Sequence, residues 1–335
     1  MTLPERNRRF LLARIPEGMP RETDFLLEEE ARPTCPANGV LVRSLWISVD
    51  PYLRGRMSGV RTYIDPIPVG SVMESAAVGQ VIDSQVASIH VGDFVAGMWG
   101  WQDYGAVDAT RVRVVDPSEA PIQTALGLLG GPGMTAYFGL MELCAPKSGE
   151  TVLVSGAAGA VGSAVGQIAK ILGCRVVGTS GTDAKSQYIQ SLGFDAALNY
   201  RTDRPYAQSL ARLCPAGIDC YFDNVGGELT DAAIALMNFR GRIAVCGQIS
   251  QYNDRSLDVG RRPFTEILVK QLRVEGFIVT RWANRFAEGR KQMAAWLNEG
   301  RLRCEETVYD GLENTPKAFI GLFHGENTGK ALVRV

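Results

Sequence analysis

The amino-acid sequence predicts an α/β protein in which a barrel-like domain of antiparallel strands is joined to a doubly wound parallel sheet. Residues 1–125 contain short apolar, partly alternating runs separated by Pro, Gly and Asp, as in an antiparallel β domain. From residue 126 onward, strand-like and helix-like patterns alternate, which is typical of a parallel sheet with helices on both faces. A chain of 335 residues is also too long for one ordinary hydrophobic core.

The same change of pattern predicts the domain boundaries. We expect one domain over residues 1–125 and a second domain over residues 126–300. The last segment, 301–335, returns to a strand–helix–strand pattern. We therefore expect it to rejoin the first domain, which would make that domain discontinuous.

The individual elements follow from hydrophobic periodicity. In the first domain, strands are expected at 40–49, 76–82 and 91–97. The second domain is expected to begin with a helix over 126–143 around a Gly-Pro-Gly break, followed by strand 151–154 and an amphipathic helix that carries Val161, Val165, Ile168 and Leu172 on one face. Further strands are expected at 174–178, 195–198, 218–223, 242–246 and 273–279. Further helices are expected at 183–192, 203–214, 227–238 and 284–299.

A glycine turn joins strand 151–154 to the helix after it, in the pattern Ala157-x-Gly159-x-x-Gly162. Strand, glycine turn and helix in this order are what a dinucleotide-binding unit requires. Gly159 lets the backbone approach a pyrophosphate, Gly162 lets the helix pack on the strand, and the helix N-terminus offers N–H groups to the anion. Alanine replaces the usual first glycine, and close packing alone would also place small residues here.

The end of the next strand selects between NAD(H) and NADP(H). An acid at this point would bind the free 2′-hydroxyl of NAD, but the strand ends in Thr179 and Ser180. Asp183 comes later, in the first helical turn, where it is a usual partner of the helix dipole. Lys185 lies one turn in and could reach a 2′-phosphate, so NADP(H) is favoured. A solvated surface lysine is the alternative interpretation.

Composition excludes several classes of protein. A net charge of −1 does not favour binding to nucleic acid or to a membrane surface. The uncharged stretches 151–169 and 120–141 are rich in Gly, Ala and Pro rather than in lipid-facing residues, and the apolar run at 10–13 is too short for a signal peptide. We therefore expect a cytoplasmic protein whose partners are small molecules or a second copy of the chain.

The sequence also lacks the patterns of several related chemistries. The seven cysteines are scattered and include no Cys-x-x-Cys pair, and the only histidines are His90 and His324. This pattern predicts neither a zinc site nor a disulfide framework. Short-chain dehydrogenases pair a tyrosine with a lysine four residues later. None of the ten tyrosines in this sequence is followed by a lysine at that distance. A hydride-transfer site without metal remains, in which tyrosine, water or cofactor hydroxyls must supply protons.

Motifs spread over nearly the whole chain carry a family resemblance. Those of the first half are Asp50-Pro-Tyr-Leu-Arg-Gly-Arg-Met57, Gly97-Met-Trp-Gly-Trp-Gln-Asp-Tyr104 and Gly131-Pro-Gly-Met-Thr-Ala-Tyr-Phe-Gly139. Those of the second half are Ala158-Gly-Ala-Val-Gly-Ser163, Gly193-Phe-Asp195, Asn199-Tyr200, Tyr221-Phe-Asp-Asn-Val-Gly-Gly227, Cys246-Gly-Gln-Ile-Ser-Gln-Tyr-Asn253 and Asn327-Thr-Gly-Lys330. As an ordered set they resemble the zinc-independent medium-chain dehydrogenases/reductases of the leukotriene/prostaglandin reductase group. Arg6-Asn-Arg-Arg9 most resembles its bacterial members, the NADPH-dependent curcumin reductases.

The resemblance implies a GroES-like first domain for the substrate, a Rossmann NADP-binding domain, usually a homodimer, and reduction of the carbon–carbon double bond of enones and enals with NADPH. It places Gly159, Ala160, Val161 and Gly162 along the pyrophosphate, and Lys185 and Tyr200 at the 2′-phosphate. The rest of the cofactor is expected to contact Asn224, Cys246, Gly247, Gln248, Ile249, Ser250, Tyr252, Phe277, Ile278, Val279 and Asn327.

Aromatic residues are the candidates for the chemical step. A phenol with a pKa near 10 is a hydrogen-bond donor at neutral pH, so Tyr252 is the first candidate to stabilise an enolate, through the nicotinamide ribose 2′-hydroxyl. Tyr52 and Tyr63 are candidate carbonyl contacts or pocket walls. The remaining candidates for the substrate pocket are Trp99, Trp101, Met134, Thr135 and Trp282. For each aromatic residue, core packing is the alternative role.

Three other functions are compatible with parts of the pattern. A metal-free quinone reductase would use the same fold. A non-catalytic dinucleotide-binding protein would bind the cofactor without turnover. A zinc alcohol dehydrogenase would require bound metal, for which the sequence offers no Cys/His cluster.

Overall fold

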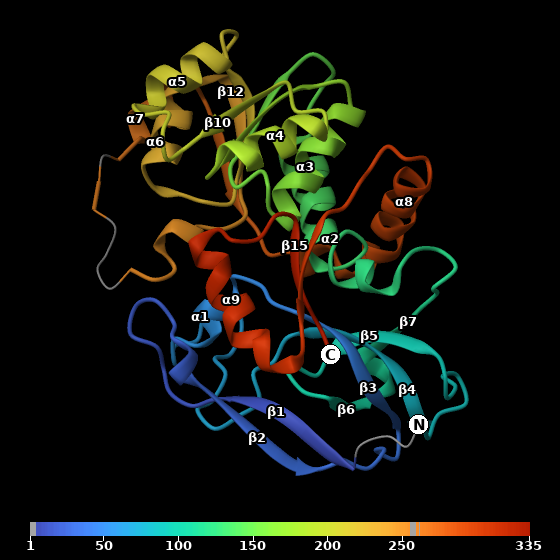
Figure 1. Cartoon of the computed structure of the whole chain (residues 1–335). Coiled ribbons are helices and arrows are strands. Elements are labelled where there is room, and N and C mark those ends of the chain that lie inside the picture. Colours follow the sequence, from blue (N-terminus) through green and yellow to red (C-terminus); the bar gives the residue numbers. More distant parts are fainter. Residues whose placement is uncertain (1–4, 255–258, 261) are drawn as a thin grey trace. The chain divides into compact units, whose positions relative to one another are not determined.

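The computed structural model describes residues 5–254, 259–260 and 262–335 (Figure 1). The chain divides into two compact units. The first unit comprises Met1–Leu126, Glu306–Asn327 and Ala331–Val335, and the second comprises Gly127–Glu305 and Thr328–Lys330. The last part of the chain therefore contributes to both units.

The first unit is built on an antiparallel sheet. Over the described residues six strands follow the order β14-β15-β3-β4-β5-β7, and β6 pairs with β3. The ten-residue strand β3 pairs antiparallel with β4, β6 and β15, and register shifts against β4 bend it. The strands are β3 (Gly39–Ser48), β4 (Ala76–Ser84), β5 (Phe94–Met98), β6 (Tyr104–Asp108), β7 (Val112–Val115), β14 (Glu306–Asp310) and β15 (Lys330–Arg334). A separate antiparallel pair is formed by β1 (Arg6–Leu12) and β2 (Phe25–Ala31).

One hydrophobic core lies within this unit. Strand β3 contributes Val40, Val42 and Ile47, which are fully buried. Helix α9 (Thr315–His324) contributes Phe319 and Leu322 from one face, at the spacing of an amphipathic helix. The short helix α1 (Leu53–Arg56) buries Leu53 against the same cluster. The antiparallel β domain predicted from the sequence is confirmed.

The second unit is a parallel sheet with strand order β10-β9-β8-β11-β12-β13 over the described residues. The chain starts in the middle at β8, moves outward through β9 and β10, and then places β11 on the other side of β8. The winding therefore reverses between β8 and β11, where open α/β sheets bind ligands at the carboxyl ends of their strands. The strands are β8 (Thr151–Val154), β9 (Arg175–Ser180), β10 (Ala196–Asn199), β11 (Ile218–Asp223), β12 (Met237–Val245) and β13 (Arg273–Gly276).

Helices connect the strands of this sheet, as in the predicted doubly wound fold (Figure 1). Helix α3 buries Val165, Ile168 and Ala169, and Thr182 caps α4 by accepting a hydrogen bond from the Lys185 N–H. The helices are α2 (Gly131–Phe138), α3 (Ala160–Ile171), α4 (Asp183–Ser191), α5 (Tyr206–Leu213), α6 (Gly227–Leu236), α7 (Phe264–Val269) and α8 (Phe286–Asn298). Shorter helical segments are η1 (Glu22–Asp24), η2 (Ala109–Arg111), η3 (Ile122–Leu126), η4 (Gly139–Cys144), η5 (Ile249–Gln251), η6 (Val279–Arg285) and η7 (Leu312–Asn314).

Several predicted boundaries are wrong. The helix expected over 126–143 begins only at Gly131, because Pro132 suits a first turn and not a helix interior, and it continues as the π-helical η4. The helix expected over 203–214 begins at Tyr206, after Pro205 in extended backbone. Strand β12 starts earlier than expected and β13 ends earlier, at Gly276. Helix α7 was not predicted. Among the described residues, no helix has the length and apolar character needed to cross a membrane.

The start of α2 requires a glycine at one position and tolerates a side chain at another. A Cβ added at Gly133 would overlap the backbone carbonyl of Leu128, whereas a Cβ at Gly131 would meet nothing within 4 Å. We expect Gly133→Ala to lower the free energy of unfolding by about 1–3 kcal/mol. Gly131→Ala, the matched control, should change it by less than about 0.5 kcal/mol. Urea unfolding followed by circular dichroism measures both, and equal midpoints would contradict the packing argument.

Candidate functional site

A buried carboxylate organises the carboxyl edge of the parallel sheet. Asp223 is the last residue of β11 and is fully buried. Its side chain accepts hydrogen bonds from Ser155 Oγ (2.9 Å), Tyr221 OH (2.8 Å), Val225 N (2.9 Å), Gly226 N (3.0 Å) and Thr230 Oγ1 (2.7 Å). These donors belong to the end of β8, to β11, to the turn after β11 and to α6. One carboxylate therefore fixes four segments at the point where the sheet reverses its winding.

The residues after β11 and β12 are tied to the same point. Asn224 donates from Nδ2 to the Ser155 carbonyl at 2.7 Å, and its N–H donates to Ser155 Oγ at 2.8 Å. The N–H groups of Cys246 and Gly247 donate to the Asp223 carbonyl at 2.8 and 3.1 Å. The structure thus brings together Asn224, Cys246 and Gly247, which the resemblance implicated. Asp223 and Ser155 were not selected from the sequence, because no spacing rule links positions 68 residues apart.

Tyr252 lies on a short segment that folds back over this edge. Within the segment, the Ile249 N–H donates to the Asn224 carbonyl at 3.3 Å, and Ser250 Oγ donates to the Val225 carbonyl at 2.6 Å. The Tyr252 hydroxyl accepts a hydrogen bond from the Gln248 N–H at 3.4 Å. Burial raises the pKa of the Tyr252 phenol above its ordinary value of 10. The phenol therefore keeps its proton at neutral pH and can donate it in a hydrogen bond.

The glycine turn after β8 has the geometry of an anion-binding loop. Gly156 has φ +60°, so the left-handed conformation belongs to this glycine and not to the following Ala157. A Cβ at Gly162 would overlap the Gly156 carbonyl, so α3 can pack on the turn only with glycine there. Gly159 is the N-cap of α3 and makes no side-chain cap, so the first N–H groups of the helix are not capped by this residue and suit an anion. Ala160 and Val161 form the first turn with Gly162.

The chain segment after α9 runs beside this turn. The Gly329 N–H donates to the Ala158 carbonyl at 2.7 Å, and Gly159 and Gly329 form an isolated parallel bridge. Asn327, another residue implied by the resemblance, precedes this segment and belongs to the first unit.

A cationic corner forms where β9 and β10 end. The Tyr200 N–H donates to the Ser180 carbonyl at 2.9 Å, and the Tyr200 ring lies where a side chain at position 181 would stand, which explains Gly181. Lys185 lies in the first turn of α4, where burial and the nearby Arg201 lower the pKa of its ammonium group. Asp183 accepts a hydrogen bond from Asn199 Nδ2 at 2.8 Å. Arg201 was not selected from the sequence, because only the fold places it near Lys185.

The other candidates of the second unit lie mainly in packing positions. Phe277 is buried, with ring centroids 6.0 Å from Phe222 and 5.7 Å from Trp282. Trp282 stacks on Phe138 at 5.7 Å. Met134 is buried in α2, and Thr135 Oγ1 donates to the Gly131 carbonyl at 2.8 Å. Ile278 is partly exposed after β13, and Val279 begins η6. For Met134, Phe277 and Trp282, the side-chain positions match the core-packing alternative.

In the first unit, Tyr52 precedes α1 and Tyr63 lies in the loop after it. Tyr63 is 58% exposed. Burial and the carboxylate of Asp50 raise the pKa of Tyr52, and Arg56, Tyr63 and Glu74 also lie close enough to influence it. The two tyrosines therefore lie near the ion pair of the buried Arg56 and the partly exposed Glu74, which the sequence pattern did not indicate.

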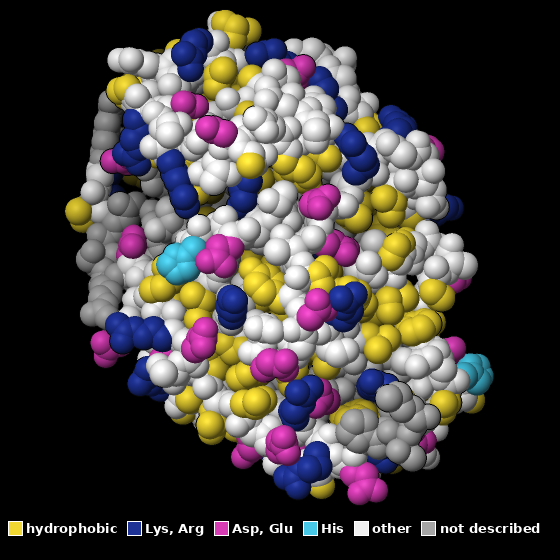
Figure 2. All heavy atoms as spheres, in the orientation of Figure 1, with side chains coloured by type: hydrophobic (Ala, Val, Ile, Leu, Met, Phe, Trp, Pro, Cys, Tyr) yellow, Lys and Arg dark blue, Asp and Glu magenta, His cyan; other side chains and the backbone are white. Residues whose placement is uncertain are grey.

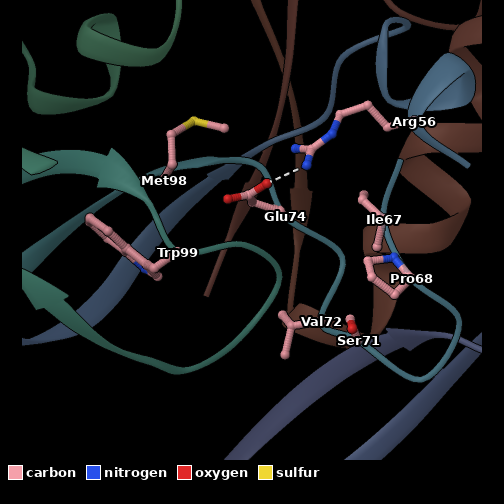
Figure 3. Close-up of a pocket in the computed structure, with 8 residues that line it drawn as sticks. All are labelled: Arg56, Ile67, Pro68, Ser71, Val72, Glu74, Met98 and Trp99. Carbon is pink, nitrogen blue, oxygen red and sulfur yellow. Dashed lines mark ion pairs between the residues drawn. The ribbon is translucent and has the colours of Figure 1, made fainter. Parts of the chain in front are cut away.

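The two tryptophans of the first unit have different surroundings. Trp101 is fully buried, with ring centroids 5.3 Å from Phe25 and 5.8 Å from Phe319, so its role is core packing. Trp99 donates from Nε1 to Ser44 Oγ at 2.9 Å and lines a cavity of about 270 Å³ (Figure 3). The other residues that line this cavity are Arg56, Ile67, Pro68, Ser71, Val72, Glu74 and Met98.

Possible metal ligands are scattered. Among the described residues, no group of three or more His, Cys, Asp and Glu side chains is placed so that it could hold a metal ion. All seven cysteines lie in the described part of the chain, and none of them forms a disulfide. Burial raises the pKa of the Cys246 thiol to about 12, so it is not a thiolate at neutral pH.

Two family models match this chain. Residues 8–115 match the family described as "N-terminal domain of oxidoreductase", and residues 160–297 match the family described as "Zinc-binding dehydrogenase". The first model spans most of β1 and all of β2 to β7, and the second spans β9 to β13 of the parallel sheet.

Relatives of known function match over almost the whole chain. The NADPH-dependent curcumin reductase of Escherichia coli is 42% identical over 99% of this chain and 97% of its own length. Prostaglandin reductase 1 of Mus musculus is 43% identical over 95% and 96%. The crystal structure of CurA in complex with NADPH from Vibrio vulnificus has a TM-score of 0.93 at 41% identity, and the match covers 98% of this chain and 99% of that one. This chain therefore belongs to the zinc-independent medium-chain dehydrogenases/reductases of the curcumin and prostaglandin reductase group.

Proposed function

We propose that this chain uses NADPH to reduce the carbon–carbon double bond of α,β-unsaturated ketones and aldehydes. The names of the curcumin and prostaglandin reductases support the reaction, and the relative solved with NADPH supports the cofactor. The single observation that carries the proposal is the cationic corner where β9 and β10 end. It combines Lys185 and Tyr200 and has no carboxylate at the end of β9.

The residues of the second unit fit a dinucleotide with a 2′-phosphate. The uncapped N-terminus of α3 suits a pyrophosphate, and Gly162 keeps that approach open. Thr179 Oγ1, at the end of β9, is buried and has no hydrogen-bond partner among the described residues. We infer that Gly159 to Gly162 hold the pyrophosphate and that Lys185 and Tyr200 hold the 2′-phosphate. Contacts to the rest of the cofactor are assigned to Asn224, Cys246, Gly247, Gln248, Ile249, Ser250, Tyr252, Phe277, Ile278, Val279 and Asn327.

When bound, NADPH supplies a hydride for the β-carbon of the enone. The protein must stabilise the negative charge that develops on the carbonyl oxygen, since that charge is absent from the ground state. Tyr252 is the proposed donor, because its hydroxyl stays protonated and is held at the sheet edge by the Gln248 N–H. Tyr52 and Tyr63 are the proposed contacts from the first unit. Trp99 and Thr135 are the proposed walls, and Met134 and Trp282 support the pocket by packing.

We also propose that the chain forms a homodimer through the β13 edge of its sheet. β13 has one strand neighbour, β12, among the described residues, so its other edge carries unpaired backbone groups. Val274 on this strand is 43% exposed, and Leu268 on α7 is 76% exposed. A second copy presents the same strand and the same apolar side chains, so a two-fold axis would satisfy both.

A small-molecule substrate and a cytoplasmic location complete the proposal. The face shown in Figure 2 mixes basic and acidic side chains, and this mixture does not favour a polyanion such as nucleic acid. The described cysteines form no disulfide, which is typical of proteins in a reducing compartment.

The cofactor assignment is tested by substitution of Lys185. Steady-state assays should show oxidation of NADPH with enones, slower reduction of quinones, and a strong preference for NADPH over NADH. We expect Lys185→Gln to lower kcat/KM for NADPH about 10- to 100-fold, because a hydrogen bond to a charged phosphate is lost. The rate with NADH should stay the same.

The exposed Lys291 provides the control, since Lys291→Gln removes a charge elsewhere on the same unit. A wild-type preference for NADH would overturn the assignment of the corner. Faster turnover of quinones than of any enone would favour the quinone reductase alternative, and cofactor binding without turnover would favour a non-catalytic role.

The role of Tyr252 is tested by removing its hydroxyl. We expect Tyr252→Phe to lower kcat/KM for an enone about tenfold or more, because one donor to the developing oxyanion is lost. In the wild type, this donor should persist up to pH values above 10, because burial raises its pKa. Tyr309→Phe is a control in the first unit. Full activity of Tyr252→Phe would show that the assignment is wrong.

The dimer is tested by light scattering coupled to size exclusion. We expect the mass of two 36.3 kDa chains for the wild type. Leu268→Glu should shift the protein to one chain, because it places a charge in an apolar contact. Leu26→Glu, at a residue of β2 that is 53% exposed, should remain a dimer. A wild-type monomer at micromolar concentration would rule the interface out.

A further inference from the structure

One side chain of the cavity wall, Trp99, is packed directly on the backbone of two strands. A Cβ added at Gly105 in β6 would lie 2.5 Å from Trp99 Cγ, and a Cβ at Gly97 in β5 would lie 3.1 Å from the same ring. Gly100, which follows Trp99, has a φ of +82°, in the left-handed region. Trp99 is 6% exposed and lines the cavity (Figure 3). The ring therefore has one position, which depends on glycine in three places.

Hydrogen bonds hold this tryptophan at both its ring and its backbone. Trp99 Nε1 donates to Ser44 Oγ at 2.9 Å, and Ser44 Oγ donates to the Gln102 carbonyl at 2.5 Å. The Gln102 side chain turns back to the same tryptophan, because its Nε2 donates to the Trp99 carbonyl at 2.5 Å. Gln102 therefore holds the backbone of Trp99 directly and its ring through one hydroxyl.

Asn7 in β1 determines which way the Gln102 amide points. Asn7 is fully buried. Its Oδ1 accepts from the Tyr104 N–H at 3.0 Å, and its Nδ2 donates to Gln102 Oε1 at 3.1 Å and to Glu30 Oε1 at 3.4 Å. A backbone N–H can only donate and a carboxylate only accepts, so the two ends of the Asn7 amide cannot be exchanged. Gln102 must then present its oxygen to Asn7 and its nitrogen to the Trp99 carbonyl.

The residue after Asn7 strengthens this contact. Arg8 donates from Nε to Asp103 Oδ2 at 2.9 Å and from Nη2 to Asp103 Oδ1 at 3.1 Å, and the Asp103 N–H donates to the Arg8 carbonyl at 3.0 Å. A two-point pair of this kind fixes direction as well as distance. Arg9, by contrast, pairs with Glu28 in β2. Asn7 and Arg8 are thus the residues of β1 that hold the tryptophan segment.

We propose that Asn7 and Gln102 are positioning residues that hold the Trp99 ring as a fixed wall of the substrate cavity. This inference rests on the proposed enone reductase function. A wall that is already fixed loses no conformational freedom when a substrate contacts it, so an enone with an aromatic substituent gains affinity. An enone without a ring gains nothing from the wall. The two amides therefore set the preference for substrate size and not the rate of hydride transfer.

Gln102→Glu tests the pair of amides with almost no change in shape. Glutamate still accepts from Asn7, but it has no N–H group for the Trp99 carbonyl. We expect KM for benzylideneacetone with saturating NADPH to rise about 3- to 10-fold, with kcat within about twofold, because the substrate must order the freed ring. KM for methyl vinyl ketone should stay within about twofold.

A matched control and a second variant separate this effect from a general loss of structure. Gln80→Glu removes a hydrogen bond of the same kind, from Gln80 Nε2 to the Gly92 carbonyl at 3.2 Å, and should change neither KM. If Gln102→Glu does not fold, Ser44→Ala keeps both amides and removes only the hydroxyl between the indole and the Gln102 carbonyl. Ser44→Ala should raise KM for benzylideneacetone in the same range and leave KM for methyl vinyl ketone unchanged.

The position of the ring is also measured without any substrate. In ¹⁵N-labelled protein, the Nε1–H resonance of Trp99 is identified by its loss in Trp99→Phe. Gln102→Glu should shift or broaden this resonance and leave those of Trp46, Trp282 and Trp296 in place, and Gln80→Glu should leave all of them in place.

Two results would overturn the positioning role. One is a Trp99 resonance that does not move in Gln102→Glu, and the other is a resonance that moves while KM for benzylideneacetone stays the same. A wild-type protein that reduces neither enone would refute the enone reductase function. The resonance of Trp99 would then still decide whether the Gln102 amide holds the ring.

Discussion

The buried carboxylate of Asp223 is the constraint on which the site of the second unit depends. A charge in the interior must be surrounded by donors, and leaving such a charge unpaired costs about 3–5 kcal/mol. Of its five donors, Ser155 lies 68 residues away in sequence and the other four lie within seven residues, so satisfying the carboxylate fixes the end of β8, the turn after β11 and the start of α6 together. The edge is therefore ordered before any ligand arrives, and binding does not have to order it.

Much of the second unit was predictable because its signals are local. Strands β8 and β11 have the bounds expected from the sequence, since each is a short run closed by turn-forming residues. Errors arose where a single residue overrides the pattern, as Pro205 does at the start of α5. Helix α7 gave no amphipathic signal, because Phe264, Leu268 and Val269 are all exposed on the monomer. Its pattern reflects a surface of this unit and not the core.

The candidate site was predictable only where function depends on neighbours in sequence. The glycine turn and Lys185 could be recognised from spacing to a strand. Asp223 and Ser155 could not, because their hydrogen bond depends on β11 lying beside β8. Trp99 and Trp101 are two residues apart with similar local sequence, yet one lines a cavity and the other is core. Packing in three dimensions decided between them.

The two units differ in how their charges are balanced. In the second unit, burial and the like charge of Arg201 lower the pKa of the Lys185 ammonium group, and an arriving dianion would offset both effects. In the first unit, Glu74 lies between Arg56, at 2.5 Å, and the more exposed Arg111, at 3.8 Å, so two guanidinium groups share one carboxylate. The proposed cofactor would thus be selected largely by its charge.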